Sequence, residues 1–455
     1  MKSRTLLFSL LLSLFVAGNY ANAQSAKDRL AMQHLLNLFE PDTAGHQAAF
    51  DFLNFAWQDE YTVMALEVLN LQRDPDIARP LLALLDAKTG ENFGYRFNLW
   101  YSWLWKKDQK VPETYADFKA ALYSLIDPKF ETYFLGRYES DIRMDEVHWG
   151  GVVQDGIPPL RQPAMIAATE ADYLADEHVV FGIEVNGDVR AYPKRILAWH
   201  EMFVDEVGGI KVTGVYCTLC GTVILYNSTF DGLEHEMGTS GFLYRSNKLM
   251  YDKRTQSLWN TLWGTPVLGP LKGRGIELEK LSVVTTTWGE WKRRHPETKV
   301  LSLETGHQRD YGEGVAYADY FATDRLMFNT PFNDKRLKNK QEVLALTFPE
   351  YPREQLAISA DFLVEKPIYQ SKLGPVSFVV FTDQSGGNRV YKTEEGIRFN
   401  KYDGKETIKD KSGATWTLYE NRLERADGKK LERLPYHRAF WFGWQAAYPN
   451  TKLIK

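Results

Sequence analysis

Cysteine is scarce in this sequence. Its 455 residues include only two cysteines, Cys217 and Cys220, in the stretch GVYCTLCGTVILYN (214–227). A closed structural zinc site of the ribbon type takes four ligands, normally from two Cys-x-x-Cys pairs. The single pair therefore excludes a zinc site built from cysteine alone, and a metal bound here must recruit other residue types.

The sequence also lacks an excess of charge of one sign. Lys and Arg number 55, Asp and Glu number 59, and the net charge is −4. Proteins that bind nucleic acid usually carry a strongly basic surface, so nucleic acid is not expected as a partner. The stretch GPLKGRGIE (269–277) has glycines without the spacing of a phosphate-binding loop, and no nucleotide cofactor is indicated.

Long apolar runs are absent after the N-terminus, so no membrane-spanning helix is expected. At the N-terminus, Lys2 and Arg4 precede a mostly apolar run at 6–16, and small residues follow up to Ala23. This order predicts a secretory signal peptide over 1–23 that is cleaved near Ala23. We therefore expect a periplasmic or secreted protein.

The next part of the sequence predicts a helical domain over 24–137. Apolar residues recur there at spacings of three and four, as in DEYTVMALEVLNLQRDPDIARPLLALLDAKTG (59–90). Paired helices of this kind weakly resemble one or two units of a HEAT solenoid. The aromatic segment WYSWLWKK (100–107) is expected in the helical core. We assign this domain to packing or to contact with a protein partner.

From 138 to 455 the sequence changes to short β-rich runs with Gly, Pro, Asn and Asp at turns. This part repeats itself. LEKLSVVTTTWGEWKRRHPETKVLSL (278–303) aligns with LERLPYHRAFWFGWQAAYPNTKLIK (431–455), so that Trp291 falls opposite Trp444. The repeat indicates two related lobes that are packed together.

The expected fold class is α+β, with a helical N-terminal domain followed by a two-lobed, internally duplicated β-rich domain. The first lobe is expected over 138–303 and the second over 304–455. Residues that both lobes share are attributed to the fold. A residue that occurs in only one lobe is not explained by the shared fold and is a candidate for function. The soft-donor residues belong to one lobe: the alignment places Asp383, Gly386 and Lys366 opposite Cys217, Cys220 and His200.

Several stretches of the chain resemble the DUF3179 family, a domain of unknown function. They are GGVVQDGIPPL (150–160), AYPKRILAWHE (191–201), YCTLCGT (216–222), GTSGFLYRSNKLMYDKRTQSLW (238–259) and FWFGW (440–444). The resemblance covers residues 140 to 455 and implies an exported or membrane-associated bacterial protein of unassigned activity. The family usually has proline after the first cysteine, where this chain has Thr218.

One interpretation of the cysteine pair is a metal site. Cys217, Cys220 and His200 would supply three ligands, all from the first lobe. Additional ligands or supporting residues in the same lobe are Glu201, His235, Met250 and Asp252. A Cys, Cys, His, Met set suits copper, whereas a set completed by carboxylate or water suits zinc. The sequence leaves the choice between copper and zinc open.

Two other interpretations also stay open. VTGVY before the pair and TVILYN after it predict strands, so the cysteines lie at a hairpin turn without the helix N-terminus that activates a thioredoxin-like thiol. The protein can still be a thiol–disulfide oxidoreductase, with Cys217 as nucleophile and Cys220 as resolving thiol. Alternatively, a disulfide staples a turn in a non-catalytic module that binds protein or glycan. The sequence does not decide whether the protein is an enzyme.

Overall fold

The computed structural model describes residues 24–107, 110–136 and 138–455. The predicted signal peptide, 1–23, lies outside these residues. None of the helices in the described ranges is long and apolar enough to cross a membrane. The chain divides into two compact units, and the division falls between Glu146 and Val147.

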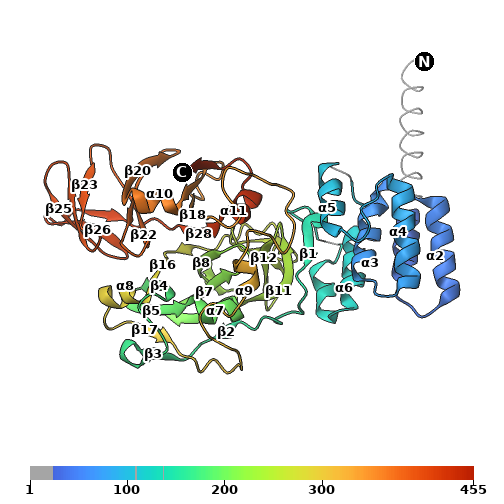
Figure 1. The fold of residues 1–455 in the computed structure, drawn as a ribbon, viewed down its shortest axis with the longest axis horizontal. Helices are drawn as coiled ribbons and strands as arrows, with labels where there is room; N and C mark the ends of the chain where they lie inside the picture. The colour runs from blue at the N-terminus through green and yellow to red at the C-terminus, as the bar shows by residue number, and fades with distance from the viewer. Residues whose placement is uncertain (1–23, 108–109, 137) are drawn as a thin grey trace, which may run out of the picture. The chain divides into compact units, whose positions relative to one another are not determined.

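The first unit is helical, as the apolar spacing predicts. A helical stretch at 24–37 is followed by α2 (Thr43–Ala56), α3 (Thr62–Leu71), α4 (Pro75–Thr89), α5 (Phe97–Lys106) and α6 (Tyr115–Ser124) (Figure 1). Short 3-10 turns lie at η1 (Asp59–Tyr61), η2 (Pro128–Tyr133) and η3 (Met144–Glu146). Trp100 and Trp105 of the aromatic segment are 0% and 7% exposed, which confirms their place in the helical core.

Local sequence explains where these helices start and stop. At the start of α4, the Asp74 side chain accepts a hydrogen bond from the backbone N–H of Asp76 (2.9 Å), and Pro75 occupies the first turn. At its end, Gly90 has a φ of 75°, a conformation that glycine adopts without steric cost. The HEAT resemblance and a partner for this unit stay predictions.

The second unit is β-rich, which confirms the α+β fold class. One five-stranded sheet has the order β1 (Val147–Trp149), β11 (Met237–Tyr244), β12 (Asn247–Asp252), β13 (Leu258–Asn260) and β14 (Thr265–Leu268). A second has the order β16 (Val284–Thr287), β4 (Val179–Val185), β5 (Asp188–Pro193), β17 (Lys299–Leu301) and β3 (Met165–Ala167). A third contains β23 (Phe399–Tyr402), β24 (Thr407–Asp410), β25 (Thr415–Leu418), β26 (Arg422–Arg425) and β27 (Lys430–Glu432).

The largest sheet has nine strands. Its order is β2 (Leu160–Arg161), β6 (Met202–Val207), β7 (Ile210–Cys217), β8 (Thr222–Asn227), β28 (His437–Phe440), β18 (Glu342–Thr347), β19 (Gln355–Ser359) and β29 (Lys452–Ile454), with β15 (Lys280–Leu281) paired to β8. Smaller sheets are formed by β20 (Ile368–Leu373), β21 (Val376–Thr382) and β22 (Asn388–Lys392), and by β9 (Thr229–Phe230) and β10 (Leu233–Glu234). The helices of this unit are α7 (Lys194–His200), α8 (Trp288–Arg294), α9 (Ala318–Phe321), α10 (Ala360–Glu365) and α11 (Trp441–Ala447), and it has one 3-10 turn, η4 (Ala168–Glu170).

A four-strand arrangement occurs twice in the second unit, as the sequence repeat predicts. One copy has the order β16-β4-β5-β17 and the other β28-β18-β19-β29. In each copy the last strand runs parallel to its neighbour and the other pairs are antiparallel. The registers correspond: Val300 lies opposite Ala191 in the first copy, and Leu453 lies opposite Ala357 in the second.

The recurring tryptophans have the same structural role in both copies. Trp291 and Trp444 are fully buried. The Nε1 of Trp291 donates to Thr298 Oγ1 (3.0 Å), and the Nε1 of Trp444 donates to Thr451 Oγ1 (2.9 Å). A buried indole N–H needs a partner, so the Trp and the Thr recur together.

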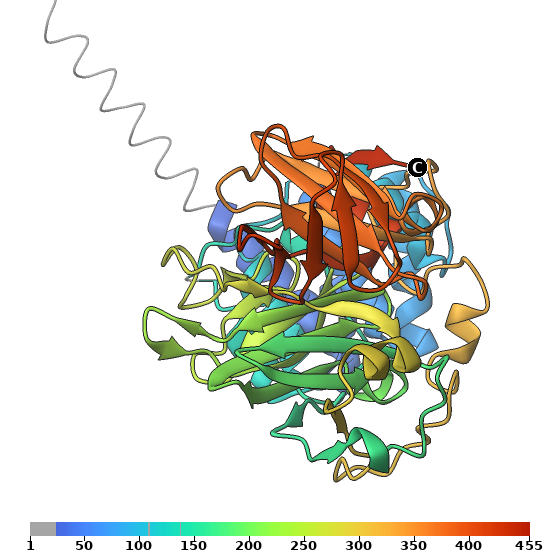
Figure 2. The ribbon, with the colours of Figure 1, turned by 90° about the vertical axis from the view of Figure 1, so that its left-hand side faces the viewer.

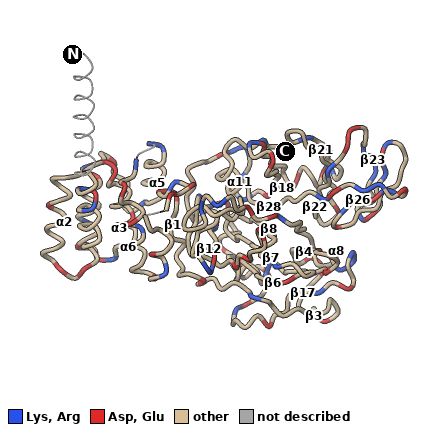
Figure 3. The backbone as a smooth tube through the Cα atoms, turned by 180° about the vertical axis from the view of Figure 1, so that it is seen from behind, with Lys and Arg blue, Asp and Glu red and all other residues tan. Residues whose placement is uncertain are grey.

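Strand pairing joins the two halves of this unit. β8 from the first half pairs with β28 from the second, through Val223 and Arg438. In Figure 2 the orange and red strands of the second half lie above the green strands of the first half. The predicted lobes therefore share a sheet, and their boundaries at 303 and 304 stay a prediction. Basic and acidic positions are interspersed along the chain (Figure 3).

Candidate thiol–disulfide site

The two cysteines lie at a hairpin turn, as the flanking strand patterns predict. β7 ends at Cys217 and β8 begins at Thr222, and these two residues are paired in the antiparallel register. Cys217 and Cys220 form a disulfide bond. Their side chains are buried, with 2% and 1% of their surface exposed.

The turn is closed on one side by glycine and by the second half of the unit. Gly221 has a φ of 59°, and a Cβ at this position would lie 2.7 Å from the ring of Phe440. The backbone N–H of Phe440 donates to the carbonyl oxygen of Cys220 (2.8 Å). A Cβ on Gly443, in α11, would lie 2.7 Å from the Cβ of Cys220. Two glycines therefore allow β28 and α11 to pack directly on the disulfide.

A buried ion pair contacts Thr218, the first of the two residues between the cysteines. The hydroxyl of Thr218 donates to Glu201 Oε1, and the ammonium of Lys248 pairs with Glu201 Oε2. Tyr317 also donates its hydroxyl to Glu201 Oε1 (3.2 Å). Thr218, Glu201 and Lys248 are 0%, 4% and 5% exposed. The loop of the disulfide is thus hydrogen-bonded to the carboxylate of Glu201, and this carboxylate in turn contacts the amine of Lys248.

Burial changes the acidity of this amine. Desolvation lowers the pKa of Lys248, while the carboxylate of Glu201 opposes that effect. Glu201 is held in place by the end of α7, where it has a φ of 56° and its backbone N–H donates to Leu197 O (2.7 Å). Its carbonyl oxygen accepts from the backbone N–H of Tyr216 (2.9 Å), directly before Cys217.

An aromatic segment covers the other side of the disulfide. We call residues 317–328, which include α9, the cover segment. Tyr320 donates its hydroxyl to the carbonyl oxygen of Leu219 (2.7 Å), and the Lys340 ammonium lies 3.3 Å from the centroid of the Tyr320 ring. Phe321 and Phe328 pack against the same buried cluster as both cysteines. Because the cysteines are 2% and 1% exposed, reagents reach the sulfur atoms only when the packing around them opens, and the cover segment is one part of that packing.

The predicted ligand His200 is fully buried, and its ring is engaged on both sides. Its Nδ1 lies 2.9 Å from the carbonyl oxygen of Pro158, and its Nε2 lies 2.6 Å from the hydroxyl of Tyr311. A carbonyl only accepts, so Nδ1 donates to Pro158 and Nε2 accepts from Tyr311. Burial lowers the pKa of His200 to about 4. A metal at Nε2 would have to displace Tyr311.

Two of the other predicted ligands, His235 and Asp252, contact each other. His235 Nδ1 lies 3.0 Å from Asp252 Oδ2, and both residues are 1% exposed. Asp252 Oδ1 accepts from the backbone N–H of Thr255 (2.7 Å) and so closes the β12–β13 turn. Asp252 Oδ1 also accepts from the backbone N–H of Arg254 (3.1 Å). In the second half, Asp410 Oδ1 accepts from Ser412 N (2.9 Å) at the same spacing, which makes this aspartate a structural feature of both copies. Met250 is fully buried in an apolar cluster.

In the part of the chain that the structure describes, no group of three or more His, Cys, Asp or Glu side chains is arranged to hold a metal ion. With Cys217 and Cys220 bonded to each other, neither offers a thiolate to a metal. A copper or zinc site at these cysteines and His200 therefore stays a prediction about the reduced protein.

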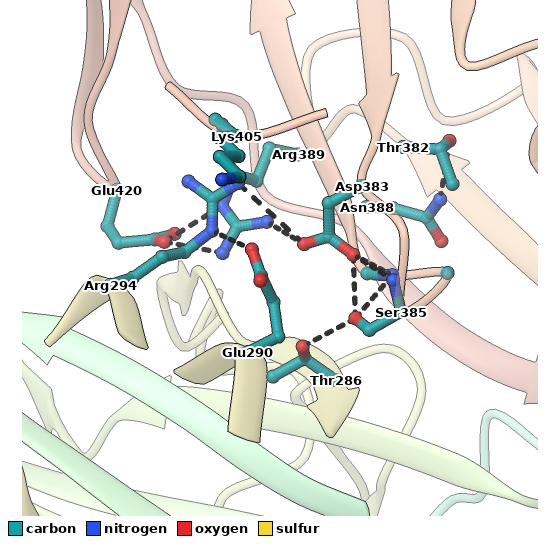
Figure 4. A network of polar contacts seen from close by, with 12 residues as sticks. Thr286, Glu290, Arg294, Thr382, Asp383, Ser385, Asn388, Arg389, Lys405 and Glu420 are labelled. Carbon is teal, nitrogen blue, oxygen red and sulfur yellow. Dashed lines mark hydrogen bonds and ion pairs between the residues drawn. The ribbon is translucent and has the colours of Figure 1, made fainter. Parts of the chain in front are cut away.

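The second half contains the same hairpin without sulfur. There Asp383 follows β21, and its Oδ1 accepts from Ser385 N (3.0 Å), Ser385 Oγ (2.6 Å) and Gly387 N (2.9 Å). Its Oδ2 pairs with the fully buried Arg389 (2.7 Å), which also pairs with Glu420 (2.7 Å) (Figure 4). A hairpin at this position can therefore be closed by a carboxylate and a buried charge network.

Lys248 and Tyr317 are site residues that the sequence reasoning missed. Lys248 lies within the stretch GTSGFLYRSNKLMYDKRTQSLW, but no spacing connects it to the cysteines or to Glu201. Glu201 was expected as a possible metal ligand or supporting residue, and the structure places it beside the disulfide loop as the partner of Lys248.

Comparison with known proteins gives one result. The model of the family described as "Protein of unknown function (DUF3179)" matches residues 154–451. No curated protein and no solved structure shows a significant match.

Proposed function

Because the chain belongs to the DUF3179 family, whose activity is unassigned, we propose a function from the site itself. Cys217 and Cys220 are a redox-active pair that exchanges with the dithiol of a partner molecule. The predicted signal peptide agrees with this proposal, because an oxidising compartment outside the cytoplasm maintains such disulfides.

The exchange is balanced without a further reactant. A partner thiolate attacks one sulfur of the pair, a mixed disulfide forms, and the other cysteine leaves as a thiolate. The second thiol of the partner then resolves the mixed disulfide. The partner is oxidised to a disulfide, the pair is reduced to two thiols, and the two protons released by the partner are taken up by the cysteines.

The observation that carries the proposal is the contact of Thr218 with the buried Glu201–Lys248 pair. Each leaving thiolate needs a proton, and in a buried site water cannot supply it freely. The lowered pKa of Lys248 makes its ammonium a stronger acid than that of an exposed lysine. Glu201 links this ammonium to Thr218 in the loop of the disulfide, and the last proton transfer, from the Thr218 hydroxyl to a sulfur, is part of the proposal.

The second half of the unit argues against a purely structural disulfide. Its equivalent hairpin is closed by Asp383 without a covalent bond. A disulfide between residues three positions apart also closes a short loop, which gives little entropic stabilisation. Neither the fold nor chain entropy therefore requires sulfur at this turn.

The reduction potential of the pair tests the proposal. The native protein would be equilibrated with glutathione or dithiothreitol redox buffers, and the fraction of reduced cysteine would be counted by thiol labelling and mass spectrometry. We expect a potential between about −120 and −270 mV, the range of known exchange proteins. A potential below about −300 mV, which is typical of structural disulfides, would contradict it.

A further inference from the structure

The second unit contains a pocket of about 410 Å³ where its two halves meet. The first half contributes the start of β4, the start of α7, β16 and the turn before β8. The second half contributes β18, β28, α10 and the β21–β22 turn (Figure 1). The volume lies in the range of sites that bind small molecules. Neither half forms this pocket alone.

Some of the charged side chains that line the pocket form ion pairs, and others do not. Arg438 pairs with Glu342 and also donates to Asn388 Oδ1 (2.8 Å), so both charges of this pair are engaged. Lys194, at the start of α7, makes no ion pair with any of the described residues; its ammonium lies 5.1 Å from the centroid of the Phe321 ring. Its charge contributes to lowering the pKa of Glu342, but its ammonium forms no direct ion pair and keeps its donors for a ligand.

A carboxylate is available on the other half. Asp361, in the first turn of α10, is exposed and accepts one hydrogen bond, from Gln341 Nε2 (2.8 Å). A carboxylate has room for about four hydrogen bonds, so Asp361 retains acceptor capacity. Lys194 comes from the first half and Asp361 from the second, which gives the pocket one unpaired charge of each sign.

Apolar side chains form the rest of the wall. Phe181, Tyr216 and Phe440 line the pocket, and the rings of Phe181 and Tyr216 lie 5.0 Å apart. Aromatic walls of this kind favour a ligand with an apolar or aromatic part. A dianion such as phosphate is disfavoured, because Glu342 and Asp361 would repel it.

We infer that this pocket binds a small zwitterion of the amino-acid type, with its carboxylate on Lys194, its ammonium on Asp361 and its apolar side chain against the aromatic wall. The inference does not depend on the redox function, since the lining contains neither cysteine. Binding is expected in the oxidised form, in which Gly221 and Phe440 of the lining pack at the disulfide turn.

The test uses isothermal titration calorimetry on the full chain with three matched probes. Phenylalanine carries both charges, phenylalaninamide lacks the carboxylate, and 3-phenylpropionate lacks the amine. We expect phenylalanine to bind at least about tenfold more tightly than either analogue, as loss of a charged hydrogen bond implies. Inorganic phosphate, as a fourth probe, is expected to bind more weakly than phenylalanine.

Substitutions assign each charge to its residue. Lys194→Met should remove the advantage of phenylalanine over phenylalaninamide, and Asp361→Asn should remove its advantage over 3-phenylpropionate. Lys372→Met and Asp172→Asn change exposed residues outside the pocket and should leave all affinities unchanged. Circular dichroism checks that each variant is folded. If a variant is not folded, the comparison of the probes on the native protein still tests the inference.

Three results would overturn the inference. One is the absence of phenylalanine binding at millimolar concentration. Another is equal affinity for all three phenyl probes, or tighter binding of phosphate. The third is an unchanged probe preference in folded Lys194→Met and Asp361→Asn variants.

Discussion

Cys217 and Asp383 stand at the same position in two copies of one hairpin. Cys217 is the last residue of β7, and Asp383 directly follows β21. One closes its turn through a bond to Cys220, the other through hydrogen bonds to Ser385 and Gly387. The duplicated fold therefore provides an internal control for what the disulfide contributes.

The two closures are predicted to differ in stability. Replacing Cys217 and Cys220 together by serine should lower the free energy of unfolding by about 2 kcal/mol, because only a short loop is released. Asp383→Ala should cost about 3 kcal/mol or more, because it leaves Arg389 buried without one of its carboxylates. Urea unfolding measures both. The opposite order would show that the disulfide is the main structural element of its hairpin.

Lys248→Met is predicted to slow disulfide reduction. Removing the amine takes away the proton donor, and a general acid contributes about 100-fold or more to such a step. Stopped-flow reduction by dithiothreitol, followed by thiol labelling, measures the rate. Lys248→Met alone also leaves Glu201 as an unpaired buried charge and should destabilise the fold.

A double variant separates these two effects. Lys248→Met with Glu201→Leu removes both charges, which should restore much of the stability while the reduction stays slow. If the double variant is reduced as fast as the native protein, the ion pair has no role in proton transfer.

Tyr320→Ala is predicted to speed the reduction about tenfold. The substitution removes the hydrogen bond to Leu219 O and part of the aromatic cover, so local opening becomes easier. Met327→Ala, at an exposed position of the same cover segment, is the control and should have no effect. An unchanged rate for Tyr320→Ala would mean that reagents reach the sulfur atoms by another route.

The buried, neutral state of His200 leads us to predict a loss of stability in mild acid. Its pKa is lowered to about 4 in the folded protein, against about 6.5 when unfolded, so below pH 6.5 the unfolded chain binds the extra proton. The free energy of unfolding should therefore fall as the pH drops from 6.5 to 4, by at most about 3 kcal/mol from this residue. His200→Gln should flatten the profile.

The metal hypothesis makes a prediction about the reduced protein. If Cys217, Cys220 and His200 bind copper or zinc, Tyr311→Phe should strengthen binding, because it frees Nε2 of His200, and His200→Gln should weaken it. Elemental analysis of anaerobically reduced protein after exposure to each metal measures this. Absence of bound metal in the native and Tyr311→Phe proteins would exclude the site.

The parts of the fold that follow local rules could be predicted from the sequence. Strand patterns on both sides of Cys217 and Cys220 identified their hairpin, because alternation and β-branching are local signals. The tryptophan repeat identified the duplicated framework, because Trp291 and Trp444 each need a threonine partner at the same spacing. Such features leave a pattern within a few residues.

The site depends on contacts that leave no such pattern. Glu201 at the end of α7 meets Lys248 on β12 through the tertiary fold, and nothing in either segment specifies the other. The orientation of His200 is set by Pro158 and Tyr311, which lie far from it in the sequence and occupy both of its nitrogens. Whether the histidine can reach the thiols could therefore not be derived from the sequence alone.

The pairing of β8 with β28 has a consequence for biogenesis. The middle of the largest sheet combines a strand near residue 223 with one near residue 438, and β29 adds a further strand at 452–454. β7 is paired to β6, and β15 covers only Leu225 and Tyr226 of β8. During synthesis or export, the part of β8 near Val223 therefore exposes an unfilled hydrogen-bonding edge until those distant residues emerge. A chain stalled before residue 437 would keep this strand edge unpaired. A chaperone, or rapid export of the whole chain, would then be needed to prevent aggregation through that edge.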